Sequence, residues 1–256
     1  MKVSIITVCF NSDKTIEKTI QSVISQKYKN IEYIIIDGNS SDNTSKIISK
    51  YSEYISKYIS EPDAGIYDAM NKGINCAEGD VVAILNSDDF YTDKNVISDV
   101  VELFTNQKVD IVYGDIEYFN QSHEDTIVRV WVAGEYKRGS FVRGWHPPHP
   151  AFFAKKSMYN KYGGFDISLN ISADFDLMLR FMDFNKAFSL YLNRSLVQMC
   201  AGGESGKSIK NIFIGNMNIL KSFRKYNMKV NPLLYLLRRL LPKVIASIQL
   251  KIKRTK

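Results

Sequence analysis

The stretch Val81-Val82-Ala83-Ile84-Leu85-Asn86-Ser87-Asp88-Asp89 decides the fold class of this chain. Five apolar residues in a row have the length of a β-strand that is covered on both faces, as the strands of parallel sheets are. The two acids follow at the carboxyl end of this strand, where open α/β sheets bind ligands. Adjacent acids repel each other unless a cation or hydrogen-bond donors offset their charge. The pair therefore predicts either a divalent metal that holds phosphates, or a solvated turn with an Asp that caps a helix.

The residues before this stretch repeat a strand-and-helix unit. Strands are predicted over 2–10 and 31–36, and apolar residues at helical spacing predict helices over 16–24, 47–58 and 66–77. The residues Asn11-Ser12-Asp13 are candidates for the N-cap of the first helix. This alternation predicts a parallel sheet with helices on both faces. Since Asn11, Asp37 and Asp88 each follow a strand, we expect a ligand crevice along that edge.

Composition and charge narrow the class of protein. The 256 residues suffice for one large α/β domain or two small lobes. Cys9, Cys76 and Cys200 have no paired spacing, which indicates free thiols in a reducing compartment rather than disulfides or a zinc site. No signal peptide and no run long enough to span a bilayer is recognised, so a cytoplasmic location is expected.

The charge is segregated along the chain. The segment after Glu204 contains 13 Lys and Arg residues and no Asp or Glu. Since the net charge of the whole chain is +7, residues 1–204 carry a net charge of −6. This separation argues against nucleic acid as the partner and favours a basic tail that meets an anionic surface. Over 232–256, leucines and isoleucines alternate with Lys and Arg in a pattern typical of helices that lie on anionic bilayers. The alternative is a helix packed on the body or in a homodimer.

The second half of the chain has weaker patterns. A helix is predicted over 96–104, a strand over 111–113, a half-exposed antiparallel strand over 127–133 and a helix over 172–183. Between them, residues 134–150 form a long loop with Trp145, His146 and His149, and long loops in compact domains are usually functional or mobile. Two prolines bound His149, so it is held extended and either contacts a substrate hydroxyl or phosphate, or packs within the loop.

Two further segments hold candidate residues. The loop 202–206 with Lys207 resembles the end of a phosphate-binding P-loop, but Ala201 stands where that motif needs glycine. We therefore expect a loop whose Lys207 contacts a phosphate without being a P-loop. Asp174 and Asp176 begin a helix; Asp176 has an ordinary i, i+4 partner in Arg180, whereas Asp174 is nearer the helix start and is the candidate for a base.

Five motifs in order give the chain a family resemblance. They are Ser4–Asn11, Ile36–Asp42, Gly65–Gly73, Leu85–Asp89 and Ala173–Leu177. Together they resemble the family 2 glycosyltransferases of the GT-A fold, which move a sugar from a nucleotide diphosphate to an acceptor hydroxyl with inversion. The likeness covers about residues 1–205 and is greatest to the branch that builds bacterial capsule, exopolysaccharide or lipopolysaccharide.

The resemblance implies a domain organisation. It gives a single Rossmann-like α/β domain with a mostly parallel sheet over residues 1–205. The nucleotide-sugar half is 1–110 and the acceptor half is 111–205. A basic, amphipathic helical extension follows over 206–256.

The resemblance also assigns roles to residues. Val8, Cys9 and Phe10 would line the pocket of the base, and Asp37 would accept a hydrogen bond from the base or ribose. Asn86, Ser87 and Asp88 occupy the Asp-x-Asp position, where Asp88 would bind Mg²⁺ or Mn²⁺ between the phosphates. Asp174 matches the catalytic base. Lys207 matches the loop that closes over the donor. Trp145 offers a ring on which an acceptor sugar can stack.

Three departures from the family pattern stand out. Asn86 replaces the first acid of Asp-x-Asp, Ala173 replaces the Glu common before the base, and Met70 replaces a common Arg. A phosphate contact from Lys72 or Lys207 would then have to replace that Arg.

The sequence thus predicts a metal-dependent glycosyltransferase on the inner face of the cell membrane. It would transfer a hexosyl or N-acetylhexosaminyl group from a UDP- or GDP-sugar to a glycan or lipid-linked acceptor. The alternatives are a sugar-phosphate nucleotidyltransferase and an inactive nucleotide-sugar-binding membrane protein.

Overall fold

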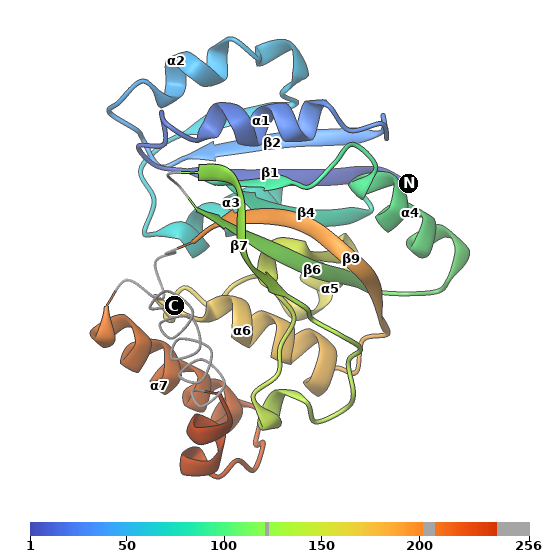
Figure 1. Cartoon of the computed structure of the whole chain (residues 1–256), viewed down its shortest axis with the longest axis vertical. Coiled ribbons are helices and arrows are strands. Elements are labelled where there is room, and N and C mark those ends of the chain that lie inside the picture. Colours follow the sequence, from blue (N-terminus) through green and yellow to red (C-terminus); the bar gives the residue numbers. More distant parts are fainter. Residues whose placement is uncertain (121–122, 202–207, 240–256) are drawn as a thin grey trace, which may run out of the picture.

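The fold is one mixed sheet with helices on both faces (Figure 1). The computed structural model describes residues 1–120, 123–201 and 208–239. The first half alternates strand and helix, in the order β1 (Val3–Cys9), α1 (Ile16–Ile24), β2 (Ile31–Asp37), α2 (Thr44–Ser49), β3 (Lys57–Ser60), α3 (Ile66–Cys76) and β4 (Val81–Asn86). The second half contains β5 (Asp89–Tyr91), α4 (Val96–Asn106), β6 (Ile111–Asn120), β7 (His123–Trp131), β8 (Phe152–Lys155), α5 (Lys156–Tyr162), α6 (Ala173–Met178), β9 (Ser189–Cys200) and α7 (Ile209–Lys225).

The strand order places the opening stretch in the middle of the sheet. The order is β3-β2-β1-β4-β8-β6-β9-β5, with β7 paired to β6. Strands β3, β2, β1 and β4 are all parallel, and antiparallel pairing begins at β8. The five apolar residues of β4 are all buried, as an unbroken apolar strand predicts. The parallel half therefore gathers the carboxyl ends of β1, β2 and β4 at one edge.

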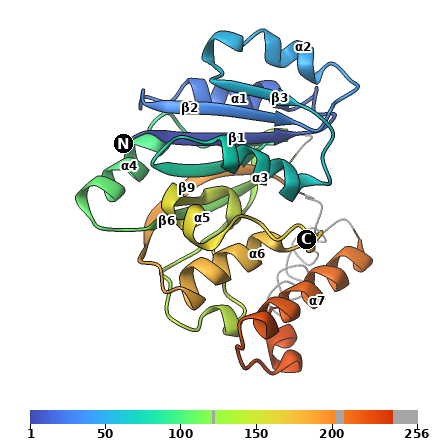
Figure 2. The same cartoon turned by 180° about the vertical axis from the view of Figure 1, so that it is seen from behind.

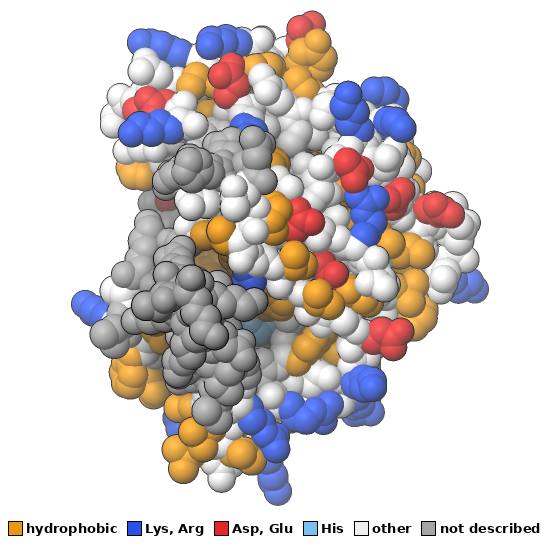
Figure 3. Space-filling model, viewed as in Figure 1, with side chains coloured by type: hydrophobic (Ala, Val, Ile, Leu, Met, Phe, Trp, Pro, Cys, Tyr) orange, Lys and Arg blue, Asp and Glu red, His pale blue; other side chains and the backbone are white. Residues whose placement is uncertain are grey.

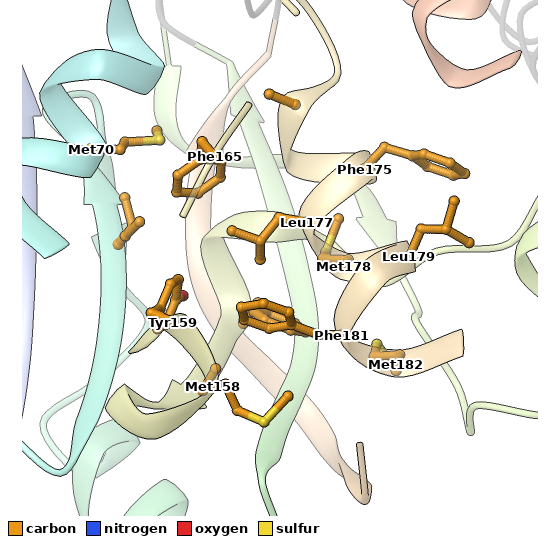
Figure 4. Packing of buried hydrophobic residues seen from close by; sticks show 14 of the residues in the cluster. Met70, Met158, Tyr159, Phe165, Phe175, Leu177, Met178, Leu179, Phe181 and Met182 are labelled. Atoms are coloured by element: carbon orange, nitrogen blue, oxygen red, sulfur yellow. The ribbon is translucent and has the colours of Figure 1, made fainter. Parts of the chain in front are cut away.

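Alternate residues of the strands feed two hydrophobic cores. On one face, Ile5 and Ala83 pack with α1, α2 and α4; on the other, Ile6 and Ile84 pack with α3, α5, α6 and α7. Figure 2 shows the second face from behind, with α3, α5 and α6 across the sheet. Figure 4 shows how Phe165 and Met70 meet the side chains of α6 and the segment after it. This second core fixes α6 against α3, a contact on which the site depends.

The predicted helix over 47–58 is wrong beyond its first turn. Helix α2 ends at Ser49, and Lys57–Ser60 forms strand β3, which pairs in parallel with Ile34–Asp37. The residues of β3 alternate between half-buried and exposed, as expected for an edge strand. The apolar spacing of Ile55 and Tyr58 fits a helix as well as it fits a strand, and pairing with β2 decides between them.

The antiparallel strand predicted over 127–133 is confirmed as far as Trp131, where β7 ends, and it pairs with β6. Residues 127–130 are exposed on both faces rather than on one, and the guanidinium of Arg129 lies 4.2 Å from the centre of the Tyr118 ring. The helix predicted over 172–183 is also confirmed, as α6 followed by a π-helical segment, Leu179–Phe184.

The chain after residue 207 packs on the body. Helix α7 buries Ile219 and Phe223, and a further helical segment, 232–239, buries Tyr235 against Phe223 with ring centroids 5.2 Å apart. These residues belong to the same hydrophobic core as Phe175 of α6. The predicted boundary at 205/206 and the part of the basic tail over 240–256 lie outside the described residues.

Candidate active site

The loops after β1 and β2 are joined by their own polar groups. Asn11 adopts the left-handed region, with φ 48°, and its Oδ1 accepts a hydrogen bond of 2.9 Å from the backbone N of Ser41. The backbone N of Ser12 donates to Thr44 Oγ1 at 2.7 Å. The predicted N-cap role of Asn11-Ser12-Asp13 is wrong, because α1 begins at Ile16 and its N-cap is Thr15. These polar residues join the loops at the carboxyl edge of the sheet instead of capping the helix.

The loop after β4 separates the two acids that opened the sequence. Asp88 is exposed, whereas Asp89 is fully buried. The side-chain Nδ2 of Asn86 donates to Asp89 Oδ2 at 3.0 Å. Burial raises the pKa of Asp89 well above its ordinary value, and the charge of Asp88 acts in the same direction, while the hydrogen bond from Asn86 opposes it. Asp88 is therefore the carboxylate that faces solvent, and Asn86 braces its neighbour.

The predicted base pocket lies at the ends of β1 and β2. Val8 and Cys9 are buried, whereas Phe10 is 63% exposed. Asp37 is fully buried, and its carboxylate accepts hydrogen bonds from the side chains of Ser40, Ser60 and Tyr58. In this structure Asp37 thus holds the β2 loop, and its contact with a base or ribose stays a prediction.

The Cys9 thiol stays protonated. Burial raises the pKa of this thiol, and the charge of Asp37 adds to the shift. The side chain therefore behaves as a small apolar group in the wall of the predicted pocket.

Lys72 is held by residues of its own segment. Its ammonium donates to the backbone O of Pro62 at 2.8 Å and pairs with Glu61 at 2.8 Å and Asp68 at 3.6 Å. A phosphate contact from Lys72 would have to compete with these carboxylates. The other predicted phosphate ligand, Lys207, lies outside the described residues, as does the loop 202–206.

Asp174 lies at the first turn of α6 and faces residues from two other elements. The hydroxyl of Tyr67, in α3, donates to Asp174 Oδ1 at 3.3 Å. His149 lies close enough that the charge of Asp174 raises its pKa, but burial is the larger effect and the net shift is downward. His149 is therefore neutral at neutral pH, and Asp174 is a half-buried carboxylate between the two halves of the chain.

Phe165 and Asn71 support this group, and sequence reasoning gave neither of them a role. Phe165 stacks on Tyr67 with ring centroids 5.4 Å apart and meets His149 edge-on at 5.5 Å. The side chain of Asn71 donates to the backbone O of Phe165 and accepts from its backbone N, at 2.9 and 2.8 Å. The sequence marked Tyr67 and Asn71 only as members of the Gly65–Gly73 motif. Their contacts could not be predicted from it, because their partners Asp174 and Phe165 are about a hundred residues away in the sequence.

Trp145 is packed rather than open. Its indole N–H donates to the backbone O of Ala133 at 2.6 Å, and its ring lies against Tyr113, Tyr136 and Phe141. The side chain is half-buried, so only part of its surface remains for a sugar. Stacking of an acceptor on Trp145 stays a prediction.

Asp176 is more than an ordinary surface partner of Arg180. The predicted i, i+4 pair is present, at 3.8 Å, but Asp176 is fully buried. Its Oδ2 accepts a hydrogen bond of 3.0 Å from the hydroxyl of Tyr226 and lies 3.6 Å from Lys225 Nζ. Asp176 therefore ties α6 to the end of α7, while Asp174 points to the site.

A metal at this edge would depend on the substrate for most of its ligands. Within residues 1–120, 123–201 and 208–239, no group of three or more His, Cys, Asp or Glu residues could hold a metal ion. Mg²⁺ is often held by one or two carboxylates together with substrate phosphates and water. The exposed carboxylate of Asp88 fits that kind of site.

Comparison with known proteins establishes the family. Residues 4–161 match the family model described as glycosyl transferase family 2. The chain belongs to this family. The matched residues include four of the five motifs, and Asp174 lies beyond them. An uncharacterised glycosyltransferase of Mycobacterium tuberculosis is 34% identical over 181 residues, which cover 70% of this chain and 68% of that protein.

Solved structures show the fold. A fragment of S. aureus TarS in complex with UDP-GlcNAc is similar with a TM-score of 0.68 at 17% identity, over 94% of this chain and 73% of that one. The mannosyltransferase PcManGT from Pyrobaculum calidifontis, in complex with GDP-Man and Mn²⁺, has a TM-score of 0.64 at 15% identity, over 94% and 69%. The chain spans 44% of the longer TarS structure. The fold of this member of family 2 is therefore GT-A, as the motifs predict.

Proposed function

We propose that the chain is an inverting glycosyltransferase that moves a hexosyl or N-acetylhexosaminyl group from a UDP- or GDP-sugar to an acceptor hydroxyl. The observation that carries this proposal is the contact between Tyr67 and Asp174. It places a half-buried carboxylate from the second half of the chain beside α3 of the first half, next to the crevice edge. Structural neighbours in complex with UDP-GlcNAc, or with GDP-Man and Mn²⁺, support the choice of donor.

The acceptor half supplies the base. Asp174 takes the proton of the acceptor hydroxyl as its oxygen attacks the sugar carbon, on the face opposite the departing diphosphate. A single carboxylate on that face gives inversion, by the same logic as in glycoside hydrolysis. Neutral His149 can donate a hydrogen bond to a substrate hydroxyl without placing a positive charge next to the base.

The donor half holds the nucleotide diphosphate. Val8, Phe10 and Asp37 would meet the base and ribose, and Ser87 and Asp88 the phosphates. Bound Mg²⁺ or Mn²⁺ supplies positive charge that stabilises the leaving diphosphate. Asp88 would hold that ion, with Lys72 and Lys207 as the candidate cations at the phosphates. The amide nitrogen of Asn86 donates to Asp89, so this side chain braces its neighbour and brings no carboxylate to the ion.

A donor screen with two variants tests this function. UDP-glucose, UDP-GlcNAc and GDP-mannose are each mixed with protein and Mn²⁺, and binding is read as a rise in Tm by mass action. Release of UDP or GDP is then measured with alkyl glycosides as acceptors. Asp174→Asn is expected to bind donor and lose turnover at least a hundredfold, as loss of a general base usually does. Full turnover by this variant would reject the base assignment.

The two alternatives give different results in the same assays. A sugar-phosphate nucleotidyltransferase releases pyrophosphate from a sugar phosphate and a nucleoside triphosphate. An inactive nucleotide-sugar-binding protein raises its Tm with donor but releases no nucleotide with any metal. The first-strand loop Cys9–Asp13 lacks the Gly-rich, basic sequence usual in nucleotidyltransferases, which favours transfer.

We further propose that the acceptor is a glycan or lipid-linked saccharide of a bacterial surface polysaccharide, reached on the inner face of the cell membrane. The exposed side of α7 carries a basic–apolar stripe, formed by Lys210, Phe213, Met217, Lys221 and Arg224. Their spacing of three or four residues puts them on one face. Figure 3 shows hydrophobic side chains at the lower left of the molecule, where Figure 1 places α7 and the segment after it. In the described part of the chain, no helix is long and apolar enough to cross a membrane.

A further inference from the structure

The hydroxyl of Tyr67 joins the two halves of the chain at the site. Tyr67 is the second residue of α3, and its hydroxyl donates to Asp174 Oδ1 at 3.3 Å across a sequence separation of 107 residues. The same hydroxyl lies against the backbone N–H groups of Ala173 and Asp174, at the start of α6. These N–H groups have no partner within their helix. One oxygen atom thus meets the first turn of α6 and one oxygen of its carboxylate.

The Tyr67 ring has little freedom to move. It stacks on Phe165 at 5.4 Å, with an angle of 23° between the rings. Phe165 is held through both of its backbone polar groups by Asn71, which stands four residues after Tyr67 on the same helix. The approach is so close that a Cβ on Gly164 would lie 2.2 Å from Asn71 Oδ1. Helix α3 therefore sets the position of the Tyr67 hydroxyl through packing that does not involve substrate.

The direction of the hydrogen bond is fixed by protonation. Burial raises the pKa of Tyr67 well above its ordinary value, and the charge of Asp174 acts in the same direction. The phenol therefore keeps its proton at neutral pH, and there it donates to the carboxylate. A carboxylate has a second oxygen, and that oxygen remains for another partner.

We propose that Tyr67 is a positioning residue, which holds Oδ1 of Asp174 so that Oδ2 faces the acceptor hydroxyl. The inference rests on the proposed role of Asp174 as the base. In the transfer step the acceptor proton goes to Oδ2 and the acceptor oxygen bonds to the anomeric carbon. The bond from that carbon to the diphosphate breaks, and the diphosphate keeps the electron pair. Tyr67 keeps its own proton throughout.

Tyr67→Phe tests the inference, because phenylalanine retains the stacked ring and removes only the hydroxyl. Turnover is measured as nucleotide release with Mn²⁺, using whichever of UDP-glucose, UDP-GlcNAc and GDP-mannose the wild type consumes, with an alkyl glycoside as acceptor. We expect kcat to fall about ten- to a hundredfold, the range for losing a hydrogen bond to a charged group. The KM for donor and the Kd for UDP or GDP are expected to stay within about twofold, since the donor site is intact.

Tyr226→Phe is the matched control. It also removes one hydroxyl that donates to a carboxylate of α6, since Tyr226 is bonded to Asp176 at 3.0 Å. Asp176 is buried and ties α6 to α7, so this variant is expected to lower Tm and to leave kcat near the wild-type value. The pair of variants separates a loss of stability from a loss of orientation.

Three results would overturn or redirect the inference. A kcat for Tyr67→Phe within twofold of wild type contradicts it, provided that Asp174→Asn is inactive. A fall in kcat also contradicts the inference if the affinity for nucleotide falls by the same factor, or if Tm falls as well. Tyr67 would then have a structural role alone. Full activity of Asp174→Asn would instead reject Asp174 as the proposed base, and this result does not depend on any Tyr67 variant.

Discussion

The hydroxyl oxygens of Ser12 and Ser87 lie 2.8 Å apart, and this hydrogen bond joins the loop after β1 to the loop after β4. Strands β1 and β4 are neighbours in the sheet, and their pairing ends at Val8 and Asn86. The bond between the two serines therefore continues the contact beyond the strand ends, next in sequence to the exposed Asp88. It also connects the predicted base pocket to the predicted phosphate site.

Ser12→Ala is expected to weaken donor binding without slowing turnover. Loss of one neutral hydrogen bond costs about 1 kcal/mol, so KM for donor should rise about fivefold while kcat changes less than twofold. Steady-state kinetics of nucleotide release measures both. Ser49→Ala is the control, because that exposed hydroxyl bonds to the backbone O of Lys46 within α2. Equal kinetics for both variants would show that the Ser12–Ser87 bond has no part in donor binding.

Asn86→Asp is expected to destabilise the protein, even though it restores the acid usual in Asp-x-Asp. The Asn86 amide donates to the fully buried Asp89, and an ionised carboxylate at position 86 has no proton to donate in its place. Losing a hydrogen bond to a buried carboxyl costs about 2–3 kcal/mol, which corresponds to a fall in Tm of about 5–10 °C for a chain of this size. Thermal unfolding at pH 7 measures the effect.

The control for that substitution is Asn43→Asp, at an exposed N-cap position where aspartate is equally favoured. It is expected to leave Tm within about 1 °C of wild type, since exposed caps accept either residue. If Asn86→Asp also keeps the wild-type Tm, then Asp89 is protonated and its carboxyl donates a hydrogen bond to the carboxylate at position 86.

The parallel half of the fold could be predicted from the sequence, because buried strands such as Val81–Leu85 carry their pattern locally. Strand β3 could not, since pairing with β2 decides its conformation and the apolar spacing of Ile55 and Tyr58 also fits a helix. Asp174 and Asp88 were found through motifs. The group around Asp174 was not, because Tyr67 and Phe165 meet only through tertiary packing. The role of Asn86 likewise depends on the burial of Asp89, and the local sequence pattern does not predict that burial.

Gly73→Ala is expected to destabilise the sheet–helix contact behind the site. A Cβ at Gly73 would lie 2.3 Å from Ile6 Cγ2 and 3.3 Å from Ile36 Cγ1, in strands that cannot move apart. Overpacking costs about 1–3 kcal/mol, and the gain of about 1 kcal/mol from helix propensity does not offset the upper part of that range. Denaturant unfolding should show a net loss of up to about 2 kcal/mol.

Gly215→Ala is the matched control in another helix. The nearest atoms to its Cβ would be Ile171 Cγ2 and Ser172 Oγ, both at 3.1 Å, so a small shift relieves the contact. The change in unfolding free energy is expected to lie within about 1 kcal/mol of zero. A Gly73→Ala variant as stable as this control would show that α3 does not need its close approach to β1.

His149 is expected to make the protein less stable as pH falls below about 6.5. Burial holds the pKa of His149 below its ordinary value, so the unfolded chain binds the proton more readily than the folded protein. The stabilising contribution is complete above the unfolded pKa of about 6.5 and is lost as pH falls through the lower folded pKa. His149→Gln should therefore flatten the fall of Tm over this range. Parallel Tm curves for variant and wild type would contradict the direction of the shift.

Binding to anionic membranes is expected to depend on the basic–apolar stripe of α7. Replacing Lys210, Lys221 and Arg224 with Glu should strongly reduce co-flotation of the full chain with vesicles that contain an anionic lipid, since each basic residue near such a surface contributes about 1 kcal/mol. The control replaces Lys27, Lys29 and Lys46 with Glu, which changes the net charge equally at exposed positions near α1 and α2. That variant should float as wild type does. Equal losses in both variants would indicate an effect of net charge alone, and unchanged flotation of the α7 variant would place membrane binding elsewhere in the chain.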